Sequence, residues 1–315
     1  MNLQAPDLPG DITSDIPDGF QPFVHNGRFA DCIGPFYAKA LPEGGFRYLF
    51  KTAAMHANPN DVTHGGALYS FADHITGHAV VNATHRGCAT IKFKEEYLSP
   101  VPLETLVEGT VELVRITRTM AFLRLRLFAG DLTLMTADGA YKLFAPFDPA
   151  MFDPLNPGLG KEEPAQGTEV LPELPEGFQP FPSQGSFPAL CGPTHYRRDK
   201  DGGFMNGFQA RQMHDNTNNI VHGGVLFTFA DDIMGRASSG ITRRMSTTIA
   251  LNVEYLAPAP LDAWIEGATE ITYMDDRFAF VRSRIFHGDR ILLTADGVWR
   301  LLQPHSYSKK TEAAK

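Results

Sequence analysis

The stretch NPNDVTHGGALYSFADH, Asn58–His74, decides the fold, because it returns as NTNNIVHGGVLFTFADD, Asn216–Asp232. The second stretch lies 158 positions after the first. The same shift of 158 positions, with no gap, places PDGFQPF at Pro17–Phe23 on PEGFQPF at Pro175–Phe181. Matches this far apart at one constant spacing indicate an internal duplication. The sequence therefore predicts two copies of one structural unit.

The duplication divides the chain into two domains, which its length of 315 residues also favours. We place the first domain at 17–146 and the second at 175–303, each close to the commonest domain size. The residues between them, 147–174, are rich in Pro, Gly and acidic side chains and have no apolar periodicity. This composition predicts an extended linker.

Each repeat contains one long helix followed by strands. Apolar residues at helical spacing follow each HGG, and they are Leu68, Phe71, Ile75 and Ala79, then Leu226, Phe229, Ile233 and Ala237. Over 248–255 apolar and polar residues alternate, which predicts a half-buried strand with Thr248 on the face opposite Leu251. Strand-like runs follow the first helix at 105–117, 120–128 and 132–144, with a Gly-Asp hairpin turn between the last two. Each half is thus predicted to be an α+β unit with an antiparallel sheet.

Composition excludes several classes of protein. Lys and Arg total 28 against 36 Asp and Glu, a net charge of -8, which argues against a nucleic-acid-binding surface. No apolar run is long enough to span a membrane, and the acidic N-terminal residues do not resemble a signal peptide. Cys32, Cys88 and Cys191 are too few for a disulfide framework or a zinc cluster. We expect a soluble cytoplasmic protein that binds neither nucleic acid nor membrane.

Polar residues recur around the predicted helix at fixed distances. An Asn lies six residues before each HGG, and an Asp lies nine residues after the His. Paired glycines at a helix start aim free N–H groups at a ligand, and the helix dipole favours negative charge there. A carboxylate in an apolar helix is costly unless it is paired. Both helices also keep a costly glycine one turn after the Asp, Gly77 and Gly235, which we interpret as space beside the carboxylate.

These Asn, HGG and FAD residues, followed by a strand ending in EYL-x-P, resemble the hotdog-fold acyl-CoA thioesterases of the phenylacetate-pathway (PaaI-like) type. The resemblance covers both halves and leaves only the linker and tails outside. It implies a double hotdog, in which each long helix is wrapped by an antiparallel sheet and the two units join through their sheets. It also implies acyl-CoA as substrate and a dimer of double-hotdog chains as the assembly. No G-x-S-x-G, H-E-x-x-H or P-loop motif is present, and no metal or other cofactor is indicated.

The resemblance assigns roles to matching residues. The aspartate acts as general base on water or as nucleophile, the N–H of the first glycine polarises the thioester carbonyl, and the asparagine amide positions the attacking group. The predicted catalytic residues are Asp73, Asp231, Asn58, Asn216, Gly65 and Gly223. Hydroxyls seven residues before the strand tyrosines assist in some members of the family, and the helix start approaches the substrate. The predicted substrate-binding residues are His64, His222, Gly66, Gly224, Thr90 and Thr248.

The resemblance also implies how the halves combine. Because the family builds its sites between units, the Asn and Gly of one half should work with the Asp of the other. Gly65 is then expected beside Asp231, and Gly223 beside Asp73.

Three alternatives stay open. A hotdog hydratase or dehydratase would use a His with an acid, but His78, five residues after Asp73, becomes Arg236 in the second half. A non-catalytic acyl-CoA-binding protein would not need a buried Asp in both halves. One half alone could be active, since Thr76 is replaced by Met234. The histidines in and after the first helix are predicted to be polar surface or interface residues. They are His74, His78 and His85.

Overall fold

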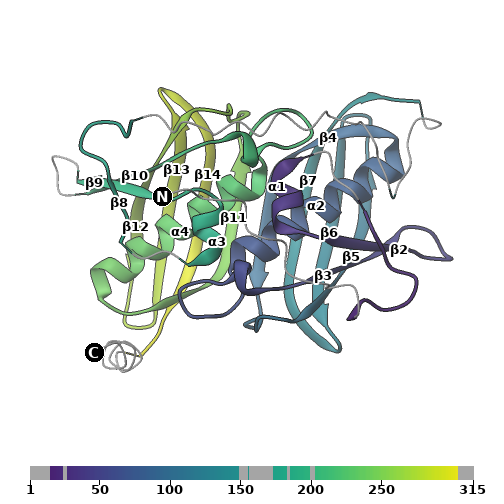
Figure 1. The fold of residues 1–315 in the computed structure, drawn as a ribbon, viewed down its shortest axis with the longest axis horizontal. Helices are drawn as coiled ribbons and strands as arrows, with labels where there is room; N and C mark the ends of the chain where they lie inside the picture. The colour runs from purple at the N-terminus through teal and green to yellow at the C-terminus, as the bar shows by residue number, and fades with distance from the viewer. Residues whose placement is uncertain are drawn as a thin grey trace.

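Two long helices pack on one face of a single antiparallel sheet of 14 strands, which confirms the α+β double hotdog (Figure 1). The computed structural model describes residues 15–23, 27–148, 155, 173–182, 185–198 and 203–303. Most of the predicted linker lies outside these residues, so its extended conformation and the domain boundaries stay predictions. In the described part of the chain, no helix is both long and apolar enough to cross a membrane.

The two halves contain the same elements in the same order. The first half contains β1 (Gln21–Pro22), α1 (Arg28–Ile33), β2 (Phe36–Ala40), β3 (Phe46–Lys51), η2 (Ala54–His56), α2 (Gly65–Thr84), β4 (Arg86–Tyr97), β5 (Leu106–Ile116), β6 (Met120–Ala129) and β7 (Leu132–Pro146). The second contains β8 (Gln179–Pro180), α3 (Ser186–Leu190), β9 (His195–Arg198), β10 (Phe204–Gln209), η4 (Gln212–His214), α4 (Gly223–Thr242), β11 (Ser246–Tyr255), β12 (Trp264–Met274), β13 (Phe278–His287) and β14 (Arg290–Leu301). The long helix and the three strand runs predicted from the sequence are therefore confirmed.

The sheet is continuous across the two halves. Its order is β1-β2-β3-β5-β6-β7-β4 and then β11-β14-β13-β12-β10-β9-β8, so the second half repeats the first in reverse. β4 and β11 join the halves as antiparallel neighbours, with Glu95 opposite Leu251 and Phe93 opposite Val253. An approximate two-fold axis therefore passes between these two strands, at the centre of Figure 1.

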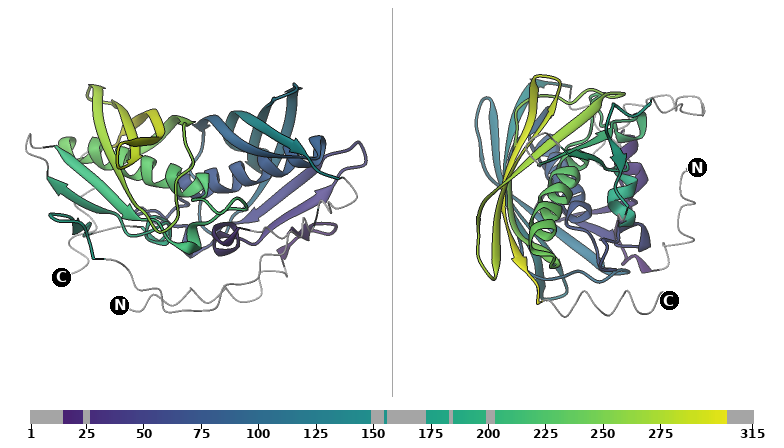
Figure 2. Two further views of the ribbon diagram at one scale, coloured as in Figure 1. Left: turned by 90° about the horizontal axis from the view of Figure 1, so that it is seen from above. Right: turned by 90° about the vertical axis from the view of Figure 1, so that its left-hand side faces the viewer.

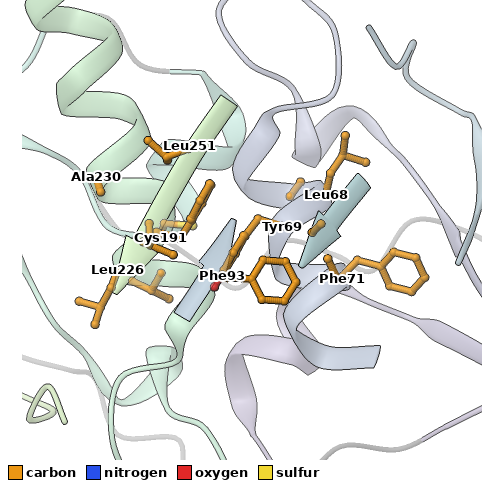
Figure 3. Close-up of a cluster of buried hydrophobic side chains, with 14 of the residues drawn as sticks. Leu68, Tyr69, Phe71, Phe93, Cys191, Leu226, Ala230 and Leu251 are labelled. Carbon is orange, nitrogen blue, oxygen red and sulfur yellow. The ribbon is translucent and has the colours of Figure 1, made fainter. Parts of the chain in front are cut away.

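The two long helices cross closely at this axis. Tyr69 of α2 stacks on Phe227 of α4 with ring centroids 3.8 Å apart. Tyr69 also forms a T-shaped ring contact with Phe93 of β4, and Figure 3 labels both residues. A Cβ on Gly66 would collide with Thr228 Oγ1, and one on Gly224 would collide with Ser70 Oγ. The second glycine of each pair is thus needed for the close packing of α2 against α4.

The short helices α1 and α3 lie on the side of the long helices away from the sheet (Figure 2). Each packs on the other half: the Phe29 N–H donates to the Asp215 carbonyl oxygen at 3.3 Å, and the Phe187 N–H donates to that of Ala57 at 3.1 Å. The loop before each long helix is therefore covered by a segment from the opposite repeat. The sequence did not predict this exchange.

The predicted strict alternation in β11 is wrong at one point. The register between β11 and β14 shifts between Thr248 and Ala250, so Ile249 is an extra residue that forms a bulge. The same shift occurs in β4 between Thr90 and Lys92. A bulge turns the side chain beside it. It directs both threonines toward the helices, where strict alternation had placed Thr248 on the opposite face.

Candidate active site

Each aspartate lies at the start of the other half's helix. A Cβ on Gly223 would lie 3.1 Å from Asp73 Oδ2, and one on Gly65 would lie 3.4 Å from Asp231 Oδ2. We call these places the Asp73 site and the Asp231 site. The structure therefore brings together the glycine and aspartate pairs expected from the sequence.

The histidine before each helix caps it and leaves one N–H open. His64 Nδ1 accepts the Gly66 N–H at 2.9 Å, and His222 Nδ1 accepts the Gly224 N–H at 2.9 Å. Among the described residues, no acceptor binds the N–H of Gly65, and the same holds for its counterpart in α4. These first N–H groups, at the positive ends of two helices, are free to bind an oxyanion.

His222 is neutral in this arrangement, because its Nδ1 accepts an N–H and therefore carries no proton. Burial lowers the pKa of His222, which outweighs the opposing charges of Asp73 and Asp215. His64 Nδ1 lies 3.8 Å from Asp231 Oδ2, beyond hydrogen-bond distance. The rings thus shape the helix start and border the carboxylates without pairing with them.

Hydroxyl groups hold the two carboxylates. Thr90 Oγ1 donates to Asp73 Oδ1 at 2.6 Å, and Tyr141 donates to the same oxygen at 3.1 Å. Thr248 Oγ1 donates to Asp231 Oδ1 at 2.7 Å, but Trp299 occupies the position equivalent to Tyr141. Among the described residues, Asp73 therefore has two hydroxyl donors and Asp231 has one.

Burial separates the two carboxylates further. Asp231 is 6% exposed, whereas Asp73 is only partly buried. Burial raises the pKa of Asp231; the nearby His64 and the Thr248 hydroxyl lower it in part, and Asp232 adds to the rise. A carboxyl with a raised pKa is a stronger base once it has ionised.

The predicted asparagines shape the loops that lead into the helices. Asn58 Oδ1 accepts the N–H of Asn60 at 2.8 Å, and Asn216 Oδ1 accepts that of Asn218 at 2.8 Å. In both repeats the amide oxygen therefore fixes a turn. The catalytic assignment of both asparagines stays a prediction, as does substrate binding by Gly66 and its counterpart.

The glycine one turn after each aspartate has different surroundings in the two halves. A Cβ on Gly77 would meet nothing within 4 Å, so open space lies beside it. A Cβ on Gly235 would lie 3.4 Å from Trp299 Nε1. The prediction that the glycine leaves space beside the carboxylate therefore holds for Gly77 in the first half. In the second half, the indole ring of Trp299 borders Gly235.

Sequence reasoning missed the tyrosines that close the sites. Tyr97 donates to the Gly65 carbonyl oxygen at 3.0 Å, and Tyr255 donates to that of Gly223 at 2.9 Å. Tyr255 also shares a hydrogen bond with Tyr69 at 2.8 Å. The repeated EYL marked both strand tyrosines, but nothing in the sequence showed that they reach the helix start.

Two rings from the exchanged short helices were also missed. Phe29 of α1 packs on His222 with centroids 5.2 Å apart, and Phe187 of α3 packs on His64 at 5.8 Å. Each capping histidine is thus held by a ring from the opposite repeat. The corresponding positions are both Phe in the two halves, but a single Phe in a short helix is weak information on its own.

The histidines of α2 were predicted to be polar surface or interface residues, and His78 differs from that prediction. It is buried within the first half, and its Nδ1 lies 2.8 Å from the Tyr48 hydroxyl. His74 lies at the Asp73 site, where its ring is nearly parallel to that of His222 with centroids 6.3 Å apart. In α4 the two positions hold Asp232 and Arg236, which form an ion pair at 2.6 Å.

The fold and the paired sites define a tandem hotdog protein. The sequence pattern of one family, the Thioesterase superfamily, matches twice, at residues 60–136 and 218–294. A Pseudomonas aeruginosa protein named as an esterase is 30% identical over 130 residues, which are 41% of this chain and 97% of that protein. The chain belongs to the Thioesterase superfamily and carries two copies of its domain.

Solved structures share the architecture. A hot dog fold protein from Alicyclobacillus acidocaldarius matches with a TM-score of 0.60 and 14% identity, covering 88% of this chain and 98% of that one. The acyl-CoA thioesterase II TesB2 from Mycobacterium marinum matches with a TM-score of 0.54 and 10% identity, covering 86% and 96%. At these identities the likeness shows a common fold.

Proposed function

We propose that the protein hydrolyses acyl-CoA thioesters to a free acid and CoA at the Asp73 site and the Asp231 site. The observation that carries the proposal is the meeting, in both sites, of a hydroxyl-held carboxylate with an open helix N–H from the other half. Membership of the Thioesterase superfamily supports the reaction class. No serine nucleophile is required by this arrangement.

The chemistry follows from the two groups. The thioester carbonyl oxygen accepts the N–H of Gly65 or Gly223, and the carboxylate takes a proton from a water molecule as that water attacks the carbonyl carbon. The negative charge of the tetrahedral intermediate then lies at a helix N-terminus, where one preorganised donor contributes about 3 kcal/mol. The intermediate collapses, the C–S bond breaks, and CoA leaves as thiolate, which takes up the proton. The acid and CoA account for all atoms of thioester and water.

The first experiment measures free-thiol release from short, long and aromatic acyl-CoAs. The double variant Asp73→Ala/Asp231→Ala should lose activity by about 10²-fold or more, because it has no general base in either site. The single variants show how the activity divides between sites. Asp138→Ala, which removes an exposed aspartate on the sheet, is the matched control and should match wild type.

The alternatives give different results in the same assay. Absence of thiol release from every acyl-CoA, with acyl-CoA binding intact, would contradict the proposal and favour a binding protein. Hydration of an enoyl-CoA would favour a hydratase. His78, which that alternative would pair with Asp73, is buried against Tyr48.

A further inference from the structure

Glu95 is a buried carboxyl group that the proposed reaction does not use. Its side chain is 0% exposed, and among the described residues neither carboxyl oxygen has a hydrogen-bond partner. It lies in β4 between Phe93 and Tyr97, on the face toward the long helices, since Lys94 and Glu96 beside it are exposed. Figure 3 shows Phe93 and Tyr69 in this same layer.

Among the residues that the structure describes, the titratable groups that act on Glu95 include no cation. Tyrosines interact with it from three elements, Tyr69 of α2, Tyr97 of β4 and Tyr255 of β11, and Asp231 does so from α4. In the flanking strands β7 and β11 its direct cross-strand neighbours are the apolar Ala137 and Leu251. A charged carboxylate without a partner is strongly disfavoured in such surroundings, so the group is neutral.

The position is not duplicated. The residue equivalent to Glu95 in the second repeat is Val253, which is also fully buried. Of the two site carboxylates, Asp231 is the one whose charge acts on Glu95. On the same strand, Tyr97 reaches the Gly65 carbonyl oxygen in the Asp231 site. Glu95 is therefore two residues from Tyr97 of the Asp231 site. Tyr255, which reaches the Gly223 carbonyl oxygen in the Asp73 site, lies farther along the neighbouring strand, directly after Glu254 opposite Lys92.

We propose that Glu95 is a neutral carboxylic acid that acts through Asp231 as a positioning residue, and that it makes the Asp231 site respond to high pH in a way that the Asp73 site does not. For its effect on catalysis this inference rests on the proposed function. The structural part of the inference, that Glu95 is a buried acid coupled to Asp231, does not depend on the proposed function.

The direction of the effect follows from the order of ionisation. Burial, and then the charge of Asp231, raise the pKa of Glu95 well above its usual value. Asp231 ionises first, because the Thr248 hydroxyl stabilises its charge and no described group donates to Glu95. While Glu95 is neutral, the Asp231 site contains a single negative charge. When Glu95 ionises, a second negative charge faces both Asp231 and the developing oxyanion, which opposes the transition state.

Thermal unfolding tests the buried acid without any turnover. The folded-state pKa of Glu95 lies above the ordinary 4.5, so folded wild type loses stability as pH rises toward that value. Glu95→Gln and Glu95→Val, the latter being the residue of the second repeat, should therefore gain in Tm over wild type. The gain should increase from about pH 4 to about pH 9 and reach a few degrees. Glu96→Gln, exposed on the same strand, is the matched control and should show no such trend.

A second comparison tests the coupling. Asp231→Asn removes the charge that acts on Glu95, so the pH-dependent gain of Glu95→Gln should shrink in that background. If the gain in Tm of Glu95→Gln does not vary with pH, the proposal that Glu95 is a buried neutral acid is wrong. If the gain is unchanged by Asp231→Asn, the proposed coupling between Glu95 and Asp231 is wrong. Neither result depends on whether the chain hydrolyses acyl-CoA.

Activity tests the catalytic part in the Asp73→Ala background, where only the Asp231 site turns over. Thiol release should fall about tenfold per pH unit above the pKa of Glu95, and Glu95→Gln should abolish this fall. The double aspartate variant corrects for spontaneous hydrolysis. A high-pH fall that persists in Glu95→Gln, or that is absent in the parent, would overturn the catalytic part. Absence of turnover at every pH would instead count against the proposed function, which the thermal data would distinguish.

Discussion

The Asp73 site and the Asp231 site share a backbone design and differ in the chemistry around it. Both place a carboxylate against an open N–H of the opposite helix and hold it with a threonine on a bulged strand. Around Asp73 the added groups are the polar Tyr141 and His74, whereas Asp231 is more buried and has Trp299 and Glu95 nearby. The comparison shows that both repeats keep the parts that place the carboxylate against the open N–H, whereas the groups that influence the proton affinity of the carboxylate differ.

Among changes that leave both aspartates' supporting backbone intact and alter only a donor, the largest effect is expected at Asp231, which has one described donor. Thr248→Val removes the only hydroxyl that binds Asp231 among the described residues, and a hydrogen bond to a charged group contributes about 1.5–3 kcal/mol. In the Asp73→Ala background we expect a loss of kcat/KM of about 10- to 100-fold. Thr90→Val in the Asp231→Ala background should lose less than about tenfold, because Tyr141 still binds Asp73.

Removing the second donor sharpens this test. The double change Thr90→Val/Tyr141→Phe should bring the Asp73 site down to the level of Thr248→Val at the other site. Equal losses for the two single threonine variants would show that the tyrosine contributes nothing.

The acid side of the pH profile should report the burial of Asp231. A general base must be ionised, so activity in the Asp73→Ala background falls as pH drops through the pKa of Asp231, which is raised from 3.8. Thr248→Val should move this fall to higher pH, because the lost hydroxyl stabilised the charged form. A profile that stays flat down to the ordinary carboxyl range would contradict the raised pKa.

The close crossing of the helices predicts an effect on stability. Gly66→Ala places a methyl group on Thr228 and should lower the free energy of unfolding by about 1–3 kcal/mol. Gly224→Ala should cost less, because Ser70 lacks the methyl group of Thr228. Denaturant unfolding measures both, and Thr228→Ala should partly rescue the first. Equal stability of Gly66→Ala and wild type would show that the crossing is not tight.

The smallest expected effect has the opposite sign. Gly77→Ala meets open space in a helix interior, so it should raise the free energy of unfolding by up to about 1 kcal/mol. Any accompanying loss of thiol release at the Asp73 site, measured with long acyl-CoAs, would show that substrate uses this space. A destabilised Gly77→Ala would contradict the open surroundings.

Periodicity and repetition predicted the elements because they depend on local patterns. The apolar spacing of Leu68, Phe71 and Ile75 located α2, and the Gly130-Asp131 pair located the turn between β6 and β7. The resemblance to hotdog thioesterases supplied the pairing of each aspartate with the opposite glycine. These features recur in both repeats, so each half supported the other.

The remaining features depend on contacts that no local pattern contains. A bulge at Ile249 is invisible to a period-two count, yet it decides that Thr248 reaches Asp231. The exchange that places Phe29 on His222 joins segments almost two hundred residues apart. In the sequence, Glu95 is one of several charged residues just before Tyr97. Only the tertiary structure shows that its side chain is buried.

The meeting of β4 with β11 has a consequence for how such a chain can evolve. Phe93 lies opposite Val253 and Glu95 opposite Leu251, so positions 95 and 253 are diagonal neighbours across the two-fold axis. In a dimer of identical single units, any glutamate at this position would face its own copy about 7–8 Å away. Joining the two units in one polypeptide removes that constraint, because a mutation then enters the molecule once. The fused gene could therefore acquire a lone acid at its central seam, where a symmetric ancestor would have had two or none.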